Sequence, residues 1–101
     1  MYIPKRARLF AMKIECQFTQ TPESQLIYHI FTQTAKDLAD IDKIKEKTPQ
    51  HVRDYRERNY NSAINFFAED GAFANNFNIY CENINIDPKW IRLVAKKLQL
   101  I

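Results

Sequence analysis

The sequence predicts a mainly α-helical fold, a single small helical domain over residues 1–101 that ends in a helix-turn-helix-like hairpin. The chain contains one glycine, whereas β folds rich in hairpins rely on glycine at their turns. Apolar residues recur at helical spacing over long stretches. Three prolines directly follow a side chain that can cap a helix, in the pairs Thr21-Pro22, Thr48-Pro49 and Asp87-Pro88. Proline loses no hydrogen bond at the first helical position, so each pair predicts a helix start.

Residues 1–20 give the least definite pattern. A basic cluster, Lys5, Arg6 and Arg8, precedes a segment in which apolar residues occupy every second position from Phe10 to Phe18. Such alternation indicates a strand, although no later segment alternates and could pair with it. The segment could therefore be extended across the helices, pair with its copy in a homodimer, or be helical. The basic cluster is either a solvated terminus or an arm that contacts phosphates.

Two long helices are expected over residues 22–70. The first should run from Pro22 to Glu46, because apolar residues between Leu26 and Ile41 recur at i, i+3 and i+4. Lysines gather toward its C-terminal end, where cations complement the helix dipole.

The second long helix should start at Pro49 and end near Glu69 or Asp70, with Gly71 as a left-handed terminating residue. It could break between residues 59 and 61, where its apolar stripe weakens. Three arginines on this helix alternate with acidic residues, which favours a solvated, salt-bridged face over a binding site. The arginines are Arg53, Arg56 and Arg58, and the acidic residues are Asp54 and Glu57.

The stretch over residues 77–98 has the outline of a helix-turn-helix. Such a unit needs a small residue where its helices cross, apolar residues beside the turn, and a turn residue that tolerates positive φ. Cys81 meets the first requirement, Ile84 and Ile86 the second, and Asn85 the third, since asparagine tolerates that conformation better than other non-glycine residues. Asn76 is expected to cap the first helix of this unit.

The second helix of the unit should carry an exposed basic face. Asp87 caps it, and Ile86 can pack on Ile91 as a hydrophobic staple. Ile91 and Val94 should be buried, and no acidic residue follows Asp87. The candidate nucleic-acid or partner-binding residues are Lys89, Arg92, Leu93, Lys96 and Lys97, with Lys5, Arg6 and Arg8 from the N-terminal cluster. Arg92 is the best candidate for reading a guanine, whereas the lysines suit phosphates.

The pattern AINFF…F-x-x-Y-C-E-N-x-N-I-D-P-K-W-I-R, residues 63–92, resembles a family of small, mostly uncharacterised proteins encoded by bacteriophages, prophages and proteobacteria. Those proteins carry an aromatic-rich helix followed by a C-x-x-x-G-I-D-P-x-x-V/I-R segment, and residues 25–38 are similar as well. The specific matches are Cys81, Ile86, Asp87, Pro88, Ile91 and Arg92. The chain departs from the pattern in Asn85, which replaces glycine, and in residues 1–20. The resemblance implies a phage or mobile-element setting and no known chemistry.

Several function classes find no support in the sequence. His29 and His51 stand apart from any cluster with metal-ligand spacing, and no catalytic motif or cofactor site is recognisable. Cys16 and Cys81 should be reduced, partly buried thiols of a cytosolic protein. No apolar run reaches the length of a membrane span. We therefore expect a protein without catalytic residues, metal or cofactor, located in the cytoplasm of a bacterial host.

Two functions fit these observations. The first is a small phage-type DNA-binding or regulatory protein that uses its basic C-terminal unit and could act as a homodimer. The alternative is a phage-encoded inhibitor or modulator that binds a host protein, of the anti-defence type, such as an anti-CRISPR. The net charge of +3 permits nucleic-acid binding without arguing for it.

Overall fold

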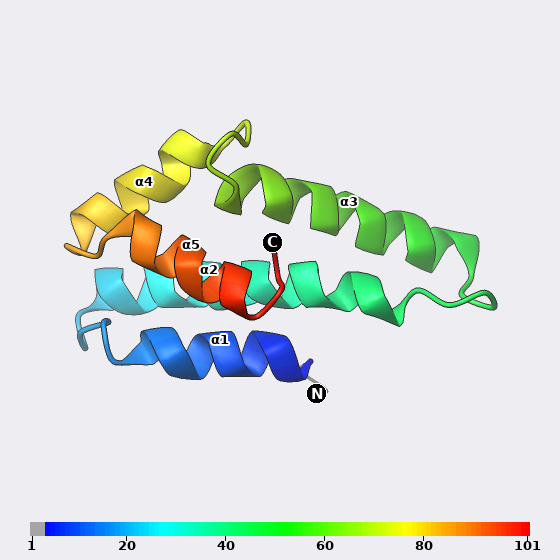
Figure 1. The fold of residues 1–101 in the computed structure, drawn as a ribbon, viewed down its shortest axis with the longest axis horizontal. Helices are drawn as coiled ribbons and strands as arrows, with labels where there is room; N and C mark the ends of the chain where they lie inside the picture. Colours follow the sequence, from blue (N-terminus) through cyan, green and yellow to red (C-terminus); the bar gives the residue numbers. More distant parts are fainter. Residues whose placement is uncertain (1–3) are drawn as a thin grey trace.

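Five α-helices and one 3-10 turn make up the fold of residues 4–101, the part of the chain that the computed structural model describes (Figure 1). The elements are α1 (Lys5–Glu15), α2 (Pro22–Asp40), η1 (Ile41–Lys43), α3 (Gln50–Phe67), α4 (Ala74–Asn83) and α5 (Pro88–Lys97). No strand occurs within these residues. The predicted mainly α-helical class is confirmed.

The helix α2 is central to the arrangement. It packs against α1 on one side and against α3 on the other. The short helix α4 contacts α3, and α5 then runs back to contact both α4 and α1. The C-terminal helix therefore joins the two ends of the chain in one bundle.

The N-terminal segment is a helix, and the expectation of an extended strand is wrong for the described residues. Phe10, Ile14 and Phe18 are buried, whereas Met12 and Cys16 between them are exposed. Buried residues four apart follow the period of a helix. The alternation of apolar residues in the sequence therefore included Met12 and Cys16, which do not face the core. A dimer contact through pairing of this segment as a strand loses its basis. The first three residues lie outside the described part.

The start of α2 agrees with the prediction, but its end does not. The Thr21 side chain accepts a hydrogen bond from the Ser24 N–H at 3.3 Å, as expected of a cap followed by proline. The helix ends at Asp40 instead of Glu46 and continues only as the 3-10 turn η1. After η1, the Lys45 N–H donates to the Thr48 hydroxyl at 2.8 Å. It therefore does not form the backbone hydrogen bond that would continue the helix.

Thr48 does not cap α3, because its hydroxyl accepts the hydrogen bond from the Lys45 N–H. Pro49 is the N-cap residue of α3, and no side chain caps it within the described residues. From Gln50 the helix runs without interruption to Phe67, so the alternative of two shorter helices with a break at residues 59–61 is wrong. Its end comes earlier than the expected Glu69 or Asp70.

Gly71 serves a different purpose from the one expected of it. Its φ is not positive, so it is not a left-handed helix terminator. A Cβ atom at this position would lie 2.2 Å from the Asn65 carbonyl oxygen, which is fixed because it accepts from the Phe73 N–H at 2.9 Å. Glycine is thus required by the close approach of two backbone segments. The next helix begins at Ala74 instead of Phe77, with Phe73 and not Asn76 as its N-cap residue.

The turn between α4 and α5 agrees with the sequence prediction. Asn85 has a φ of 57°. The Ile86 N–H donates to the Cys81 carbonyl at 3.0 Å, and the Asn85 N–H donates to the Glu82 carbonyl at 3.2 Å. These two bonds define a Schellman motif, in which a left-handed residue ends a helix. Asp87 then caps α5 by accepting from the Lys89 N–H at 2.9 Å.

The end of α5 repeats this motif with a glutamine. Gln99 has a φ of 58°, and the Leu100 N–H donates to the Ala95 carbonyl at 2.9 Å. Leu100 is buried, which anchors the residues that follow α5 to the core.

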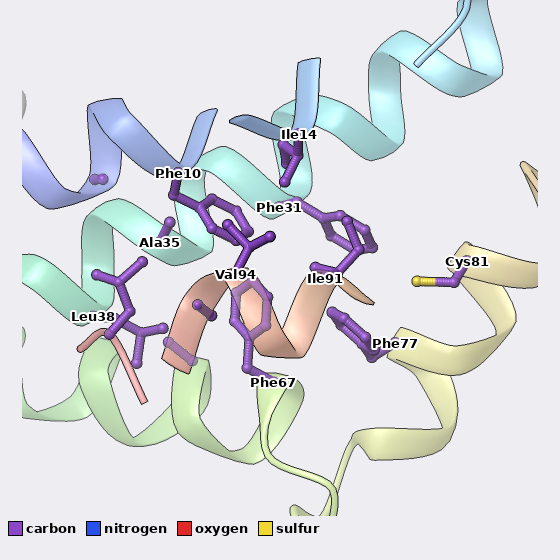
Figure 2. Close-up of a cluster of buried hydrophobic side chains, with 14 of the residues drawn as sticks. Phe10, Ile14, Phe31, Ala35, Leu38, Phe67, Phe77, Cys81, Ile91 and Val94 are labelled. Carbon is purple, nitrogen blue, oxygen red and sulfur yellow. The ribbon is translucent and has the colours of Figure 1, made fainter. Parts of the chain in front are cut away.

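Aromatic rings dominate the core. Phe31 of α2 is fully buried, and its ring centroid lies 5.0 Å from that of Phe77 and 6.1 Å from that of Phe67. Ile91 and Val94 of α5 lie among these rings (Figure 2). Phe67 belongs to the buried core, and Phe66 and Trp90 are partly buried and pack against it.

Candidate nucleic-acid interface

One face of α5 presents three lysines and a leucine to solvent. Lys89, Leu93, Lys96 and Lys97 are exposed, and we call them the α5 lysine face. Leu93, Lys96 and Lys97 follow Lys89 by four, seven and eight residues. This spacing places all four on one side of the helix, opposite the buried Ile91. None of the three lysines forms an ion pair with a residue between 4 and 101.

Arg92 does not belong to this face, so its expected exposure is wrong. Only 5% of its surface is exposed. Its Nε donates to the Phe67 carbonyl oxygen at 2.7 Å, and its guanidinium carbon lies 4.5 Å from the centroid of the Phe77 ring. A guanidinium held in this way cannot reach a base edge in a groove.

The role of Arg92 is to join three helices. Phe67 is the last residue of α3, and carbonyls at a helix C-terminus lack partners within their own helix. Arg92 of α5 satisfies one of them and places a cation at the negative end of the α3 dipole. The stacking on Phe77 adds α4 to the same contact. Arg92 lies one helical turn before the buried Ala95, but the sequence does not reveal the distant carbonyl.

The N-terminal basic cluster does not form one arm, because α1 directs its members to different sides. Arg6 is half-buried; it pairs with the Asp42 carboxylate of η1 and donates to the Gln99 carbonyl beyond α5. Lys5 is exposed beside it. Arg8 is exposed on another side, where it lines a groove between α1 and α2. Only Lys5 and Arg6 therefore lie toward the end of α5.

A shallow hollow of about 480 Å³ lies beside the α5 lysine face. Lys96 and the edge of Arg92 line it together with Glu69 and Asp70 from the connection after α3. These carboxylates offset part of the charge of Lys96. Lys89 and Lys97 are therefore the less compensated cations of the face.

The two cysteines differ in exposure. Both thiols are free; Cys16 is exposed, which corrects the expectation that it is partly buried, and Cys81 is fully buried. Burial is the main cause that raises the pKa of the Cys81 thiol to about 12 from the ordinary 9.0. Such a thiol stays protonated and unreactive near neutral pH.

A thiol-reactive disulfide reagent is expected to modify one cysteine of the folded protein and two after denaturation.

The raised pKa of Cys81 also makes stability depend on pH. Above about pH 9 the unfolded thiol loses its proton while the folded thiol keeps it up to about pH 12, so the free energy of unfolding should fall over this range. Urea titrations at increasing pH measure the fall, and Cys81→Ala should show a smaller one. An equal fall in this variant would contradict the assignment.

Between residues 4 and 101, no three histidine, cysteine or acidic side chains are grouped closely enough to hold a metal ion. None of the helices in this part is long and apolar enough to cross a bilayer.

The resemblance of residues 63–92 to phage-encoded proteins stays a prediction. Comparison of the chain with models of known protein families, with curated proteins and with solved structures found no match.

Proposed function

We propose that the chain binds nucleic acid through the α5 lysine face, by contacts with phosphates instead of bases. The observation that carries this proposal is the exposure of Lys89, Lys96 and Lys97 on one side of a capped helix whose other side is buried. Lysines that neutralise phosphates give affinity that does not depend on sequence. The burial of Arg92 removes the side chain best suited to read a guanine.

The hairpin of α4 and α5 supports the proposal by its construction. A helix-turn-helix must hold its second helix by one face while the other face meets the DNA groove. Here Ile91 and Val94 hold α5, and Asn85 sets the turn before it. A small regulatory protein would use such a hairpin to bind DNA with broad sequence tolerance, and the resemblance implies a phage or mobile-element setting for it.

Duplex binding that weakens steeply with salt is the expected result. Fluorescence anisotropy of a labelled mixed-sequence DNA duplex, measured across a range of NaCl concentrations, gives the slope of log affinity against log salt. Lys89→Gln and Lys97→Gln should each lower this slope by about 1, because each removes one phosphate contact. Arg58→Gln is the matched control, since Arg58 is exposed on α3 beside Asp54 and Glu57.

Two outcomes would reject this proposal. Absence of duplex binding at low salt would exclude nucleic acid as the partner. If the salt slopes of Lys89→Gln and Lys97→Gln equal that of the Arg58→Gln control, the α5 lysine face is not the binding site. Circular dichroism of each variant verifies that the protein is folded, since exposed substitutions change stability by about 0.5 kcal/mol or less.

Leu93 favours a second candidate function, the binding of a host protein. Its side chain is 48% exposed in the middle of the α5 lysine face, where an apolar group suits a protein interface better than a phosphate. A phage inhibitor of the anti-defence type would fit this mixed surface. Wild type and Leu93→Gln are compared as baits in a nuclease-treated bacterial lysate. A protein retained by the wild type and lost with Leu93→Gln supports this function, whereas identical retention contradicts it.

A further inference from the structure

A second cationic site lies where α1 begins. A cleft of about 560 Å³ is formed by the first turn of α1, by η1 with the linker after it, and by α3. The charged residues that line it are Lys5, Arg6, Asp42, Lys43, Lys45 and Arg56. Five basic residues against one acidic residue give the cleft a net charge of +4, whereas the whole chain carries only +3. The positive charge of the protein is thus concentrated here.

The acidic residues nearby compensate only part of the charge of this cationic cleft. Asp42 is already paired with Arg6, and the Asp40 carboxylate accepts from the Lys43 ammonium at 3.2 Å. Lys5, Lys45 and Arg56 form no ion pair with any residue between 4 and 101. Like charges gathered in this way repel one another, and a bound anion would relieve the repulsion.

Arg56 shows how the structure departs from the expected salt-bridged face. The sequence suggested that Arg56 pairs with acidic neighbours on its own helix. Instead the Asp54 carboxylate accepts from the Gln50 amide at 2.7 Å, and Arg56 makes no ion pair with any residue between 4 and 101. Arg56 lines the cleft together with Asp42 and Lys43 of η1, and it also borders a hollow that contains Asp37 and Asp40, without an ion pair to either. Its guanidinium is therefore available to a ligand.

We infer that the cationic cleft is a second phosphate-binding site, which holds the backbone of the same nucleic acid that the α5 lysine face contacts; this inference rests on the proposed function. The chemistry of the lining favours phosphates over a protein partner. Its only apolar residues, Pro4 and Ala39, are buried. A protein interface needs apolar or aromatic anchors, whereas phosphate contacts need only lysine and arginine.

Arg6 connects the cleft with the α5 lysine face. It lines the cleft, and its guanidinium also donates to the Gln99 carbonyl, two residues beyond Lys97. The cleft therefore adjoins the C-terminal end of the face. A nucleic-acid strand that leaves Lys97 would enter the cleft at Arg6 and Lys5. The result is one continuous path for phosphates across α5, the start of α1, and α3.

The test uses duplex titrations in NaCl with variants of the cleft. Lys45→Gln and Arg56→Gln should each lower the salt slope by about 1, because each removes one phosphate contact. Arg58→Gln should leave the slope unchanged, although it lies on the same helix as Arg56 and removes the same charge. Lys45 is exposed and Arg56 half-buried, and neither forms an ion pair within residues 4–101, so both variants should remain folded.

The failures of the two proposals give different results. If Lys89→Gln and Lys97→Gln lower the slope while Lys45→Gln and Arg56→Gln match the Arg58→Gln control, the cleft is not a phosphate site and the proposed function stands. If only the cleft variants lower the slope, the α5 lysine face is not the site and the cleft binds the duplex by itself. A wild-type protein that does not bind the duplex at low salt overturns both.

Discussion

Phe31→Ala is expected to lower the free energy of unfolding by about 3–5 kcal/mol, the cost typical of removing a buried phenylalanine. Phe31 is fully buried, and its ring contacts those of Phe18, Phe66, Phe67 and Phe77. Its removal leaves a cavity at the point where α2, α3 and α4 meet. For a domain of this size, an unfolding free energy of about 5–15 kcal/mol is usual, so a large part of the stability is lost. Urea denaturation followed by circular dichroism measures the change.

Phe73→Ala is the matched control for this prediction. The chemical change is identical, but Phe73 is 50% exposed in the connection before α4. Its removal should cost about 1 kcal/mol or less, because little apolar area returns to water. Similar losses for Phe31→Ala and Phe73→Ala would contradict the assignment of Phe31 to the core.

Arg92→Ala should have the second largest effect, about 2–4 kcal/mol of lost stability. The substitution leaves the Phe67 carbonyl without its partner, which costs about 1–3 kcal/mol, and it removes the stacking on Phe77. Lys96→Ala removes a charge from the same helix at an exposed position and should cost about 0.5 kcal/mol or less. Equal losses in the two variants would show that Arg92 is a surface residue.

Arg92→Met separates stability from binding. Methionine retains much of the side-chain volume but cannot donate to the Phe67 carbonyl, so this variant should be less destabilised than Arg92→Ala. Because the guanidinium lies inside the protein, the folded Arg92→Met variant should bind the duplex with the salt slope of the wild type. A lower slope would mean that Arg92 contacts phosphate.

Local chemistry explains the features that the sequence predicted well. Thr21 and Asp87 accept hydrogen bonds from N–H groups only two or three residues away. Asn85 ends α4 through bonds that span at most five residues. Such features depend on neighbours in the chain, so they can be read from short stretches of sequence.

The features that the sequence missed depend on hydrogen-bond partners and backbone contacts that helical spacing does not reveal. Thr48 has the same local pattern as Thr21, but its hydroxyl is used by Lys45. Gly71 is required by the carbonyl of Asn65 across a tight connection. Arg92 is buried because a carbonyl 25 residues earlier in the chain needs a donor. Spacing along one helix carries no information about these partners.

The cationic cleft was missed for the same reason. Its basic residues come from α1, from the linker around η1 and from α3, and each group looks mixed or solvated in the sequence alone. The basic residues of the N-terminal cluster are close together in the sequence, but the helix separates Arg8 from Lys5 and Arg6. Charge that gathers from three segments becomes visible only in the folded chain.

The contact between α1 and α5 has a consequence for the order of folding. Arg6 and Gln99 are 93 residues apart in the chain, and α1 also packs directly against α5. Contacts between helices that are neighbours in sequence, such as α1 and α2, close short loops and can form early. The contacts between α1 and α5 close the longest loop in the fold. During synthesis, the apolar side of α1 that packs on α5 stays uncovered until α5 has left the ribosome. Hydrogen exchange in α1 should therefore become slow only after α5 has docked.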